Sequence, residues 1–282
     1  MFIDIHSHLR FHPIYTPRPT PEELWEEYRR RDIEKAVILP TVNPECAEGF
    51  QSVEELLEKC RDYPWIIPFC NIDPRMLSNS PQADLVGLAR HYKQLGCKGI
   101  GELAANLEFL DPRCQNLFHA AAVCDLPVTF HIGPYPGRGY GVYDDVGLPQ
   151  LEETLKRFPT VKFFAHSQAF WAEIGELDRP DDRAGYPEYP VRPGRAVELL
   201  RRYPNLYGDL SAGSGANALT RDRKHAIGFL NEFQDKLMFG TDLFVLDQLR
   251  DFLLELRAAG AIAETVFRKV ARENAIRLLA LE

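Results

Sequence analysis

Phe2-Ile3-Asp4-Ile5-His6-Ser7-His8-Leu9 is the stretch that decides the fold of this chain. Its apolar and β-branched residues predict a short buried strand that ends in a His-x-His pair. Side chains alternate between the two faces of a strand, so we expect His6 and His8 to point the same way, about 7 Å apart. Two imidazoles on one face at a strand end suit a transition metal, whereas the alternative is an exposed histidine pair without a role. The choice depends on whether the rest of the chain supplies matching ligands.

Length and composition indicate a soluble globular protein. The 282 residues are enough for one large barrel or two ordinary domains, and 45% are hydrophobic and 26% charged. A formal net charge of −8 argues against a nucleic-acid or anionic-membrane partner. Six cysteines without a C-x-x-C pair predict reduced thiols in a cytoplasmic protein. We expect no signal peptide, and no apolar run reaches the ~18 residues that span a bilayer.

Short apolar segments recur along the chain, rich in β-branched or aromatic residues and bounded by Pro, Gly, Asn or Asp, as strands are. Segments with helical periodicity separate them. A strand–helix unit repeated eight times in a chain of this length predicts an α/β fold of the (β/α)8 TIM-barrel type, with residues 1–282 forming a single domain. The predicted strands are Phe2–His6, Lys35–Thr41, Trp65–Ile72, Cys97–Leu103, Leu126–Ile132, Val161–Ser167, Asn205–Ser211 and Lys236–Leu243.

The connections add detail to this repeat. Gln168–Gly194 is rich in proline and lengthens the connection after the sixth strand, where it would lie over the barrel mouth, so we predict a lid-like insertion. One helix is predicted over Ala216–Phe233. Two helical segments, Leu246–Ala259 and Ile262–Leu281, follow the last strand, so the chain is expected to end with an extra helix.

Histidines and carboxylates stand at or near the C-terminal ends of five predicted strands. In a barrel these ends converge on one mouth, where the catalytic residues of barrel enzymes gather. Four imidazoles and two carboxylates suit Zn²⁺, Mn²⁺ or Fe²⁺, and they do not suit Ca²⁺. The sequence therefore predicts a metal site formed by His6, His8, Glu102, His131, His166 and Asp242.

The chain resembles the amidohydrolase superfamily, most closely its amidohydrolase-related and aminocarboxymuconate-semialdehyde-decarboxylase-like branch. The resemblance covers essentially the whole chain and rests on residues 4–8, 165–167, 239–242 and 273–279. It implies that His6, His8 and Asp242 hold one metal, and that His131 and His166 hold a second ion or share the first. One or two ions per chain are therefore expected, with zinc favoured over manganese and iron.

Members of this superfamily differ in the side chain that the fourth strand carries at the metal site. Many members bridge two metals there with a carbamylated lysine or a glutamate, and the matching position here is Glu102, because Lys98 lies nearer the start of the strand. Decarboxylase-like members do not generally use a fourth-strand acid in this way. Glu102 therefore favours hydrolysis.

We expect a metal-dependent hydrolase of an amide, ester or lactone bond in a small substrate, carboxylated substrates included. A metal would lower the pKa of water and polarise the carbonyl under attack. The resemblance implies that Asp242 accepts the proton of the attacking water, while His131 or His166 stabilises the oxyanion. The alternative is a non-oxidative decarboxylase of an aromatic or unsaturated carboxylic acid. A deoxyribonuclease, suggested by Ile100–Glu102, is disfavoured by the acidic net charge.

Further residues carry two interpretations each. Arg138 beside Tyr135 suits a clamp for a substrate carboxylate, or is simply exposed in a Gly-rich loop. Trp171 closes over the pocket, or packs the insertion against the barrel. Asp4 orients a metal ligand, or is a buried and paired acid. Asp209 is a candidate substrate contact at a strand end.

The expected partner is a small-molecule substrate, with no nucleic acid and no membrane. The resemblance allows a homo-oligomer, although no residue marks an interface. His12 follows His8 by four residues, but a histidine in a loop is usually solvated, so we assign it no ligand role.

Overall fold

The computed structural model of the chain describes residues 1–9, 19–243 and 246–282, and His12 lies outside them. Its paired strands run parallel, in a three-stranded sheet, β1-β2-β3, and a six-stranded sheet, β4-β5-β7-β8-β9, with β6 beside β5. The strands are β1 (Phe2–Ser7), β2 (Ile33–Ile38), β3 (Ile66–Pro68), β4 (Ile100–Leu103), β5 (Val128–Gly133), β6 (Val142–Tyr143), β7 (Phe163–His166), β8 (Leu206–Asp209) and β9 (Leu237–Met238).

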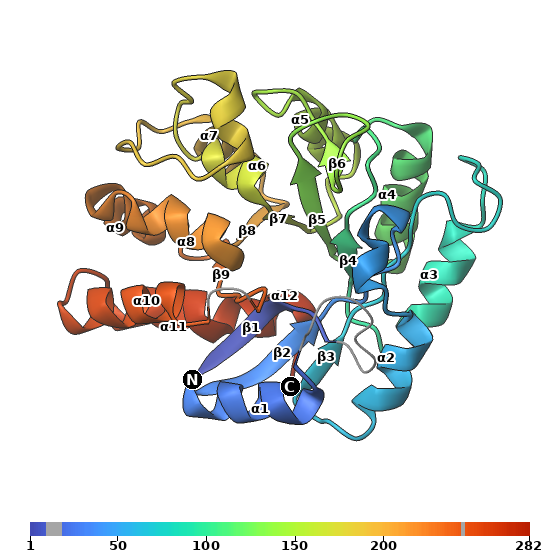
Figure 1. The fold of residues 1–282 in the computed structure, drawn as a ribbon, viewed down its shortest axis with the longest axis horizontal. Coiled ribbons are helices and arrows are strands. Elements are labelled where there is room, and N and C mark those ends of the chain that lie inside the picture. The colour runs from blue at the N-terminus through green and yellow to red at the C-terminus, as the bar shows by residue number, and fades with distance from the viewer. Residues whose placement is uncertain (10–18, 244–245) are drawn as a thin grey trace.

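Hydrogen bonds join the two sheets at both seams. Between β3 and β4, the Gly101 amide donates to the Cys70 carbonyl at 2.8 Å. Between β1 and β9, the Ile5 amide donates to the Phe239 carbonyl at 2.9 Å, and the Asp242 amide donates to the His6 carbonyl at 2.8 Å. Parallel strands joined in this order, with helices around them, are consistent with a (β/α)8 barrel (Figure 1).

Helices connect the strands, and several begin at a residue whose side chain caps the helix. The Thr20 hydroxyl accepts from the Glu23 amide, and the Ser52 hydroxyl accepts from the Glu55 amide, so each satisfies an otherwise unpaired donor. The helices are α1 (Pro21–Arg30), η1 (Pro44–Gly49), α2 (Val53–Cys60), α3 (Leu85–Gln94), α4 (Pro112–Cys124), α5 (Pro149–Arg157), α6 (Gln168–Ala172), η2 (Pro180–Ala184), α7 (Arg195–Arg202), α8 (Ala212–Thr220), α9 (Arg223–Glu232), α10 (Gln248–Ala258), α11 (Glu264–Arg268), η3 (Lys269–Glu273) and α12 (Asn274–Leu279).

The predicted helix over Ala216–Phe233 is two helices. α8 begins at Ala212, earlier than predicted, and ends at Thr220, and α9 begins at Arg223. Asp222 lies between them, and its carboxylate accepts from the His225 amide at 3.0 Å. An aspartate that caps a helix start favours a break over a continuous helix, and this explains the difference from the prediction.

The segment after the last strand contains two helical regions, which fall within the two predicted helical segments. α10 is followed by α11, by the π-helical η3 and by α12. In α12, Ala275 and Leu278 pack into a small core cluster with Ile5 of β1 and Phe69, which follows β3. The C-terminal residues thus belong to the same packed core as the strands.

Within the described residues, no helix combines the length and the apolar character needed to cross a membrane.

Candidate metal centre

The side chains predicted as metal ligands lie together at the C-terminal ends of the strands. His6 belongs to β1, Glu102 to β4, His131 to β5 and His166 to β7, while His8 and Asp242 lie just beyond β1 and β9. All four imidazoles are buried. Parallel strands bring their C-terminal ends to one mouth, so residues distant in sequence meet in a small volume.

One group of donor atoms surrounds the His-x-His pair. The Nε2 atoms of His6 and His8 are 3.1 Å apart. Glu102 Oε2 lies 3.6 Å from His6 Nε2 and 3.4 Å from His8 Nε2. Asp242 Oδ1 lies 3.7 Å and 3.4 Å from the same two nitrogens. In a tetrahedral site with bonds of 2.0–2.1 Å, neighbouring ligand atoms are about 3.3 Å apart, so these separations fit a single divalent ion.

A second group lies on the other side of the same carboxylates. Glu102 Oε1 is 2.8 Å from His131 Nδ1 and 3.8 Å from His166 Nε2. Asp242 Oδ2 is 3.8 Å from His166 Nε2. Glu102 and Asp242 therefore each turn one oxygen toward the His6–His8 pair and the other toward His166. Nitrogen and carboxylate oxygen donors in two adjoining groups fit Zn²⁺ or a similar transition metal.

Three of the remaining ring nitrogens are held by neighbours outside these groups. Asp209 Oδ2 lies 2.6 Å from His6 Nδ1, and Ser211 Oγ lies 2.9 Å from His166 Nδ1. The Leu39 carbonyl oxygen is 2.8 Å from His8 Nδ1. Partners of this kind determine which ring nitrogen faces a metal. The sequence marked Asp209 only as a candidate substrate contact and gave Ser211 no role.

Backbone contacts place the two carboxylates. Asp242 has a φ of +52°, a left-handed conformation that aspartate tolerates better than most residues, and its amide is bonded to β1. The Asn71 side-chain amide donates to the Glu102 carbonyl at 2.8 Å and to the Pro40 carbonyl at 2.8 Å. Buried Asn71 therefore ties the end of β4 to the chain after β2.

The ionisable side chains of the cluster shift one another's pKa values. Burial opposes protonation of His6, but Asp209, Glu102 and Asp242 raise its pKa well above the ordinary value. Burial also opposes ionisation of Glu102, but His6 and His131 hold its pKa well below the ordinary value. Burial and the neighbouring His6 charge lower the pKa of His166 to about 3. Concentrated negative charge facing imidazole nitrogens is the donor set that a divalent cation requires.

Asp4 does not contact the imidazoles, although the alternation of β1 had placed it on their face. Its carboxylate accepts from the Tyr28 hydroxyl at 2.6 Å and from the Thr241 amide at 3.0 Å, and also from the His6 amide. The pairing of β1 with β2 shifts register between Asp4 and Ser7, which breaks the simple alternation. Asp4 is therefore a buried, paired acid, and burial raises its pKa to about 6.

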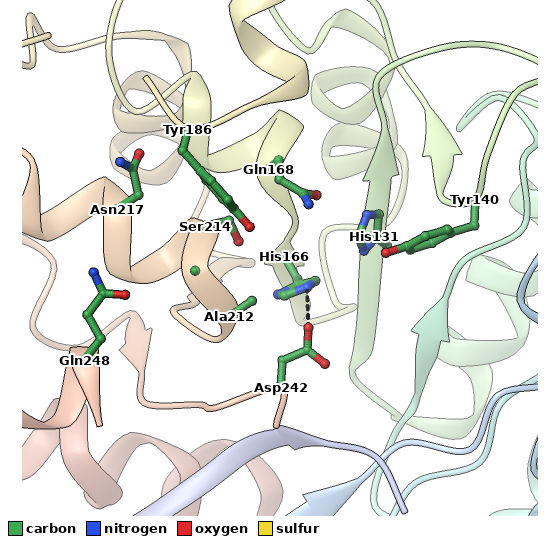
Figure 2. A pocket seen from close by; sticks show the side chains of 11 residues that line it. His131, Tyr140, His166, Gln168, Tyr186, Ala212, Ser214, Asn217, Asp242 and Gln248 are labelled. Carbon is green, nitrogen blue, oxygen red and sulfur yellow. Dashed lines mark ion pairs between the residues drawn. The ribbon is translucent and has the colours of Figure 1, made fainter. Parts of the chain in front are cut away.

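A cavity of about 570 Å³ opens beside the cluster (Figure 2). His131, His166 and Asp242 form one side, and the other walls come from the loop after β5, the insertion, α8 and α10. The cavity is large enough for a small molecule. Its other lining residues are Tyr140, Gln168, Tyr186, Ala212, Gly213, Ser214, Asn217 and Gln248.

The lining of this cavity does not include the predicted substrate-binding residues Arg138, Tyr135 and Trp171. Arg138 is exposed and lies over the Tyr135 ring, 5.6 Å from its centroid. Trp171 is buried, and its indole nitrogen donates to the Asp209 carbonyl at 2.8 Å. The Gly-rich loop turns Arg138 toward solvent, while the apolar surroundings of Trp171 hold the insertion against the barrel.

Comparison with known proteins gives one family and several similar folds. A family model described as "Amidohydrolase" matches residues 3–281. Curated proteins give no match.

Solved structures similar to the chain include both hydrolases and a decarboxylase. 2,6-dihydroxybenzoate decarboxylase from Rhizobium has 15% identity and a TM-score of 0.63, covering 99% of this chain and 98% of that one. A zinc-bound amidohydrolase from Burkholderia multivorans has 16% identity and a TM-score of 0.64, covering 100% of both chains. A probable 2-pyrone-4,6-dicarboxylic acid hydrolase from Acinetobacter baumannii has 14% identity and a TM-score of 0.59, covering 99% of both chains. At these identities the likeness is one of fold.

Proposed function

Because the chain belongs to the amidohydrolase family, we propose that it hydrolyses an amide, ester or lactone bond in a small molecule. Members of this family are metal-dependent enzymes, either hydrolases or decarboxylases. The observation that carries the proposal is the position of Glu102. Its two oxygens face different groups of histidines, 3.4 Å from His8 Nε2 and 2.8 Å from His131 Nδ1.

Two adjoining sites are proposed within the cluster. His6, His8 and Asp242 would hold one ion, His131 and His166 would hold a second, and Glu102 would lie between them. Zinc fits the nitrogen-rich donor set best, with manganese or iron as alternatives. Metal bound here would lower the pKa of a water molecule to near neutrality and polarise the carbonyl under attack.

The protein residues then supply proton transfer and positioning. Asp242 borders the cavity, so it can take the proton of the attacking water and deliver it to the leaving group. His131 or His166, whichever is not committed to metal, would stabilise the charge that develops on the carbonyl oxygen, since both line the cavity. Arg138 has no role in this proposal, because it lies outside the lining of the cavity.

The fold around the site completes the proposal. We propose that residues 1–282 form one barrel domain and that residues 168–194 act as a lid, since Tyr186 of this segment lines the cavity. The substrate would reach the site as a free small molecule in the cytoplasm. Helix α6 and the turn η2 lie within the segment, so the proposed lid has ordered elements of its own.

The second candidate is a non-oxidative decarboxylase on the same site. The Rhizobium decarboxylase, with a TM-score of 0.63, resembles the chain in fold as closely as the hydrolases do. In that reaction a proton would be delivered to the carbon that loses carbon dioxide. Release of carbon dioxide from a panel of aromatic and unsaturated acids would favour the decarboxylase, and acid release from lactones, esters or amides would favour the hydrolase.

Metal content of the Glu102→Gln variant tests the paired site. We expect two ions per chain in the parent protein after zinc loading, and about one in the variant, because a neutral amide is a poor bridging ligand. Glu108→Gln, at an exposed position in the loop between β4 and α4, is the matched control and should keep both ions. Equal metal content in parent and Glu102→Gln would contradict the bridging role. A protein that binds metal but releases no acid from the panel would contradict hydrolysis.

A further inference from the structure

We propose that the substrate is a neutral molecule rich in hydroxyl or amide groups, and that Gln168, Gln248 and Ser214 recognise it. This inference rests on the proposed hydrolysis and names the substrate class for the same cavity. It begins from the wall formed by Gln168, Gly213, Ser214, Asn217 and Gln248. That wall is polar but carries no charge among its described residues.

Hydrogen-bonding groups without protein partners line this wall. The Ser214 hydroxyl is buried and has no hydrogen-bond partner within the described part of the chain. The side-chain amides of Gln168 and Gln248 line the cavity and form no hydrogen bond with another described residue. Each amide offers two donors and an acceptor, and a serine hydroxyl donates and accepts. A buried hydroxyl left unpaired costs free energy, so a ligand that pairs with it gains affinity.

Two tyrosines extend the same chemistry across the cavity. Figure 2 shows Tyr140 and Tyr186 on opposite sides, with the Tyr186 hydroxyl directed toward the interior. The Tyr140 ring packs against the His131 ring, with 4.5 Å between the ring centroids. Tyrosine combines a flat apolar ring with one hydroxyl, which suits a ring that bears hydroxyl groups.

Positive charge is missing from the lining formed by the described residues. No lysine or arginine belongs to it, and Arg138 is exposed on the neighbouring loop. A substrate carboxylate placed against this wall would lose its water without gaining an ion pair, which is costly. Hydroxyl and amide groups lose less hydration free energy at this wall, and they find both hydrogen-bond donors and acceptors there. The wall therefore discriminates by charge as well as by hydrogen bonding.

A matched pair of lactones tests the inference. Glucono-1,4-lactone and glucaro-1,4-lactone differ only in whether the terminal carbon is a hydroxymethyl group or a carboxylate. With the zinc-loaded protein, we expect kcat/KM to be at least roughly tenfold higher for the neutral lactone, since one unpaired charge should cost more than one hydrogen bond. Equal or higher kcat/KM for glucaro-1,4-lactone would overturn the inference.

Amide truncation tests the named residues. Gln168→Ala and Gln248→Ala should each raise KM for glucono-1,4-lactone roughly 2- to 10-fold, the loss expected for one neutral hydrogen bond. KM for δ-valerolactone, which has no hydroxyl groups, should change by less than about twofold. Gln94→Ala, at an exposed position on α3, is the matched control and should change neither value. A similar loss for both lactones in the cavity variants would contradict recognition of hydroxyl groups.

A binding measurement distinguishes the failure of this inference from the failure of the proposed function. If the zinc-loaded protein hydrolyses no lactone, ester or amide, the proposed function fails, but calorimetry with the same two lactones still tests the wall. Tighter binding of glucono-1,4-lactone supports the inference. Tighter or equal binding of glucaro-1,4-lactone overturns it, whichever reaction the centre performs.

Discussion

Replacing Asp209 with asparagine removes the negative charge behind His6 and leaves the size of the side chain nearly unchanged. Asp209 Oδ2 lies 2.6 Å from His6 Nδ1, and both side chains are fully buried. This contact turns His6 Nε2 toward Glu102 and Asp242. Burial opposes ionisation of Asp209, but His6 and His166 hold its pKa below the ordinary value, so the carboxylate is charged at neutral pH.

The size of the effect follows from this geometry. A carboxylate that holds a metal-binding imidazole fixes its tautomer and increases its basicity, and losing such a partner costs about 10- to 100-fold in metal affinity. That range corresponds to about 1.4–2.8 kcal/mol of binding free energy. Asparagine can still accept a hydrogen bond from His6 through its oxygen, so we expect Asp209→Asn near the lower end. Asp209→Ala, which also leaves a cavity, should lie near the upper end.

The assay is a zinc titration against a competing chelator of known affinity, with urea unfolding measured on the same samples. Asp62→Asn is the control, because Asp62 is exposed on the turn after α2. We expect the control to bind zinc as the parent does. Zinc affinity of Asp209→Asn within twofold of the parent, in a protein that unfolds at the same urea concentration, would refute the orienting role of Asp209.

Two further predictions concern stability. Burial, against the opposing influence of Arg183, raises the pKa of Glu173 from 4.5 to about 7, so the folded state holds this proton more tightly than the unfolded chain. Protonation of Glu173 contributes up to roughly 3 kcal/mol to the unfolding free energy; this contribution is fully present below pH 4.5 and is lost as the pH rises through 7. Glu173→Gln should therefore flatten the fall of the unfolding free energy between pH 5 and 8. An unchanged slope in urea titrations would contradict this. Tyr28→Phe removes the hydroxyl that donates to Asp4 at 2.6 Å and should lower the unfolding free energy by about 1–3 kcal/mol. Urea unfolding checks this, and a change below about 0.5 kcal/mol would mean that water replaces the hydroxyl.

The strands could be predicted because their composition is local. β-branched runs bounded by turn residues located β1 to β5 and β7 to β9, although the paired segments are shorter than predicted: Lys236–Leu243 contains only β9, Leu237–Met238. Apolar residues beyond the ends of a strand remain buried without pairing, so composition overestimates strand length. β6 was missed because Val142–Tyr143 follows a Gly-rich loop and pairs only at the end of β5. The break at Asp222 was missed because helical periodicity continues across it.

The convergence of the candidate metal ligands could be predicted because the fold relates strand ends to one another. His131 and His166 pair directly in the register of β5 and β7, a consequence of strand order alone. The side chains that hold the ligands in place follow no such rule. Asp209 and Ser211 act through contacts whose distances depend on packing in three dimensions. An acid at the end of the seventh predicted strand, where the other ligands gather, was the one available signal for Asp209.

In the proposed hydrolysis, the uncharged wall and the acidic centre would together favour the transition state over the substrate. Glu102, Asp209 and Asp242 bring three negative charges to the centre, and two divalent ions would exceed them by one positive charge. A neutral carbonyl compound gains negative charge on its oxygen only as water attacks, so the excess positive charge would stabilise the transition state more than the ground state. A substrate carboxylate would be attracted before reaction and would lose part of that difference. Because such a wall admits neutral, hydroxyl-bearing molecules, the excess positive charge would act mainly on the carbonyl oxygen that becomes negative in the transition state.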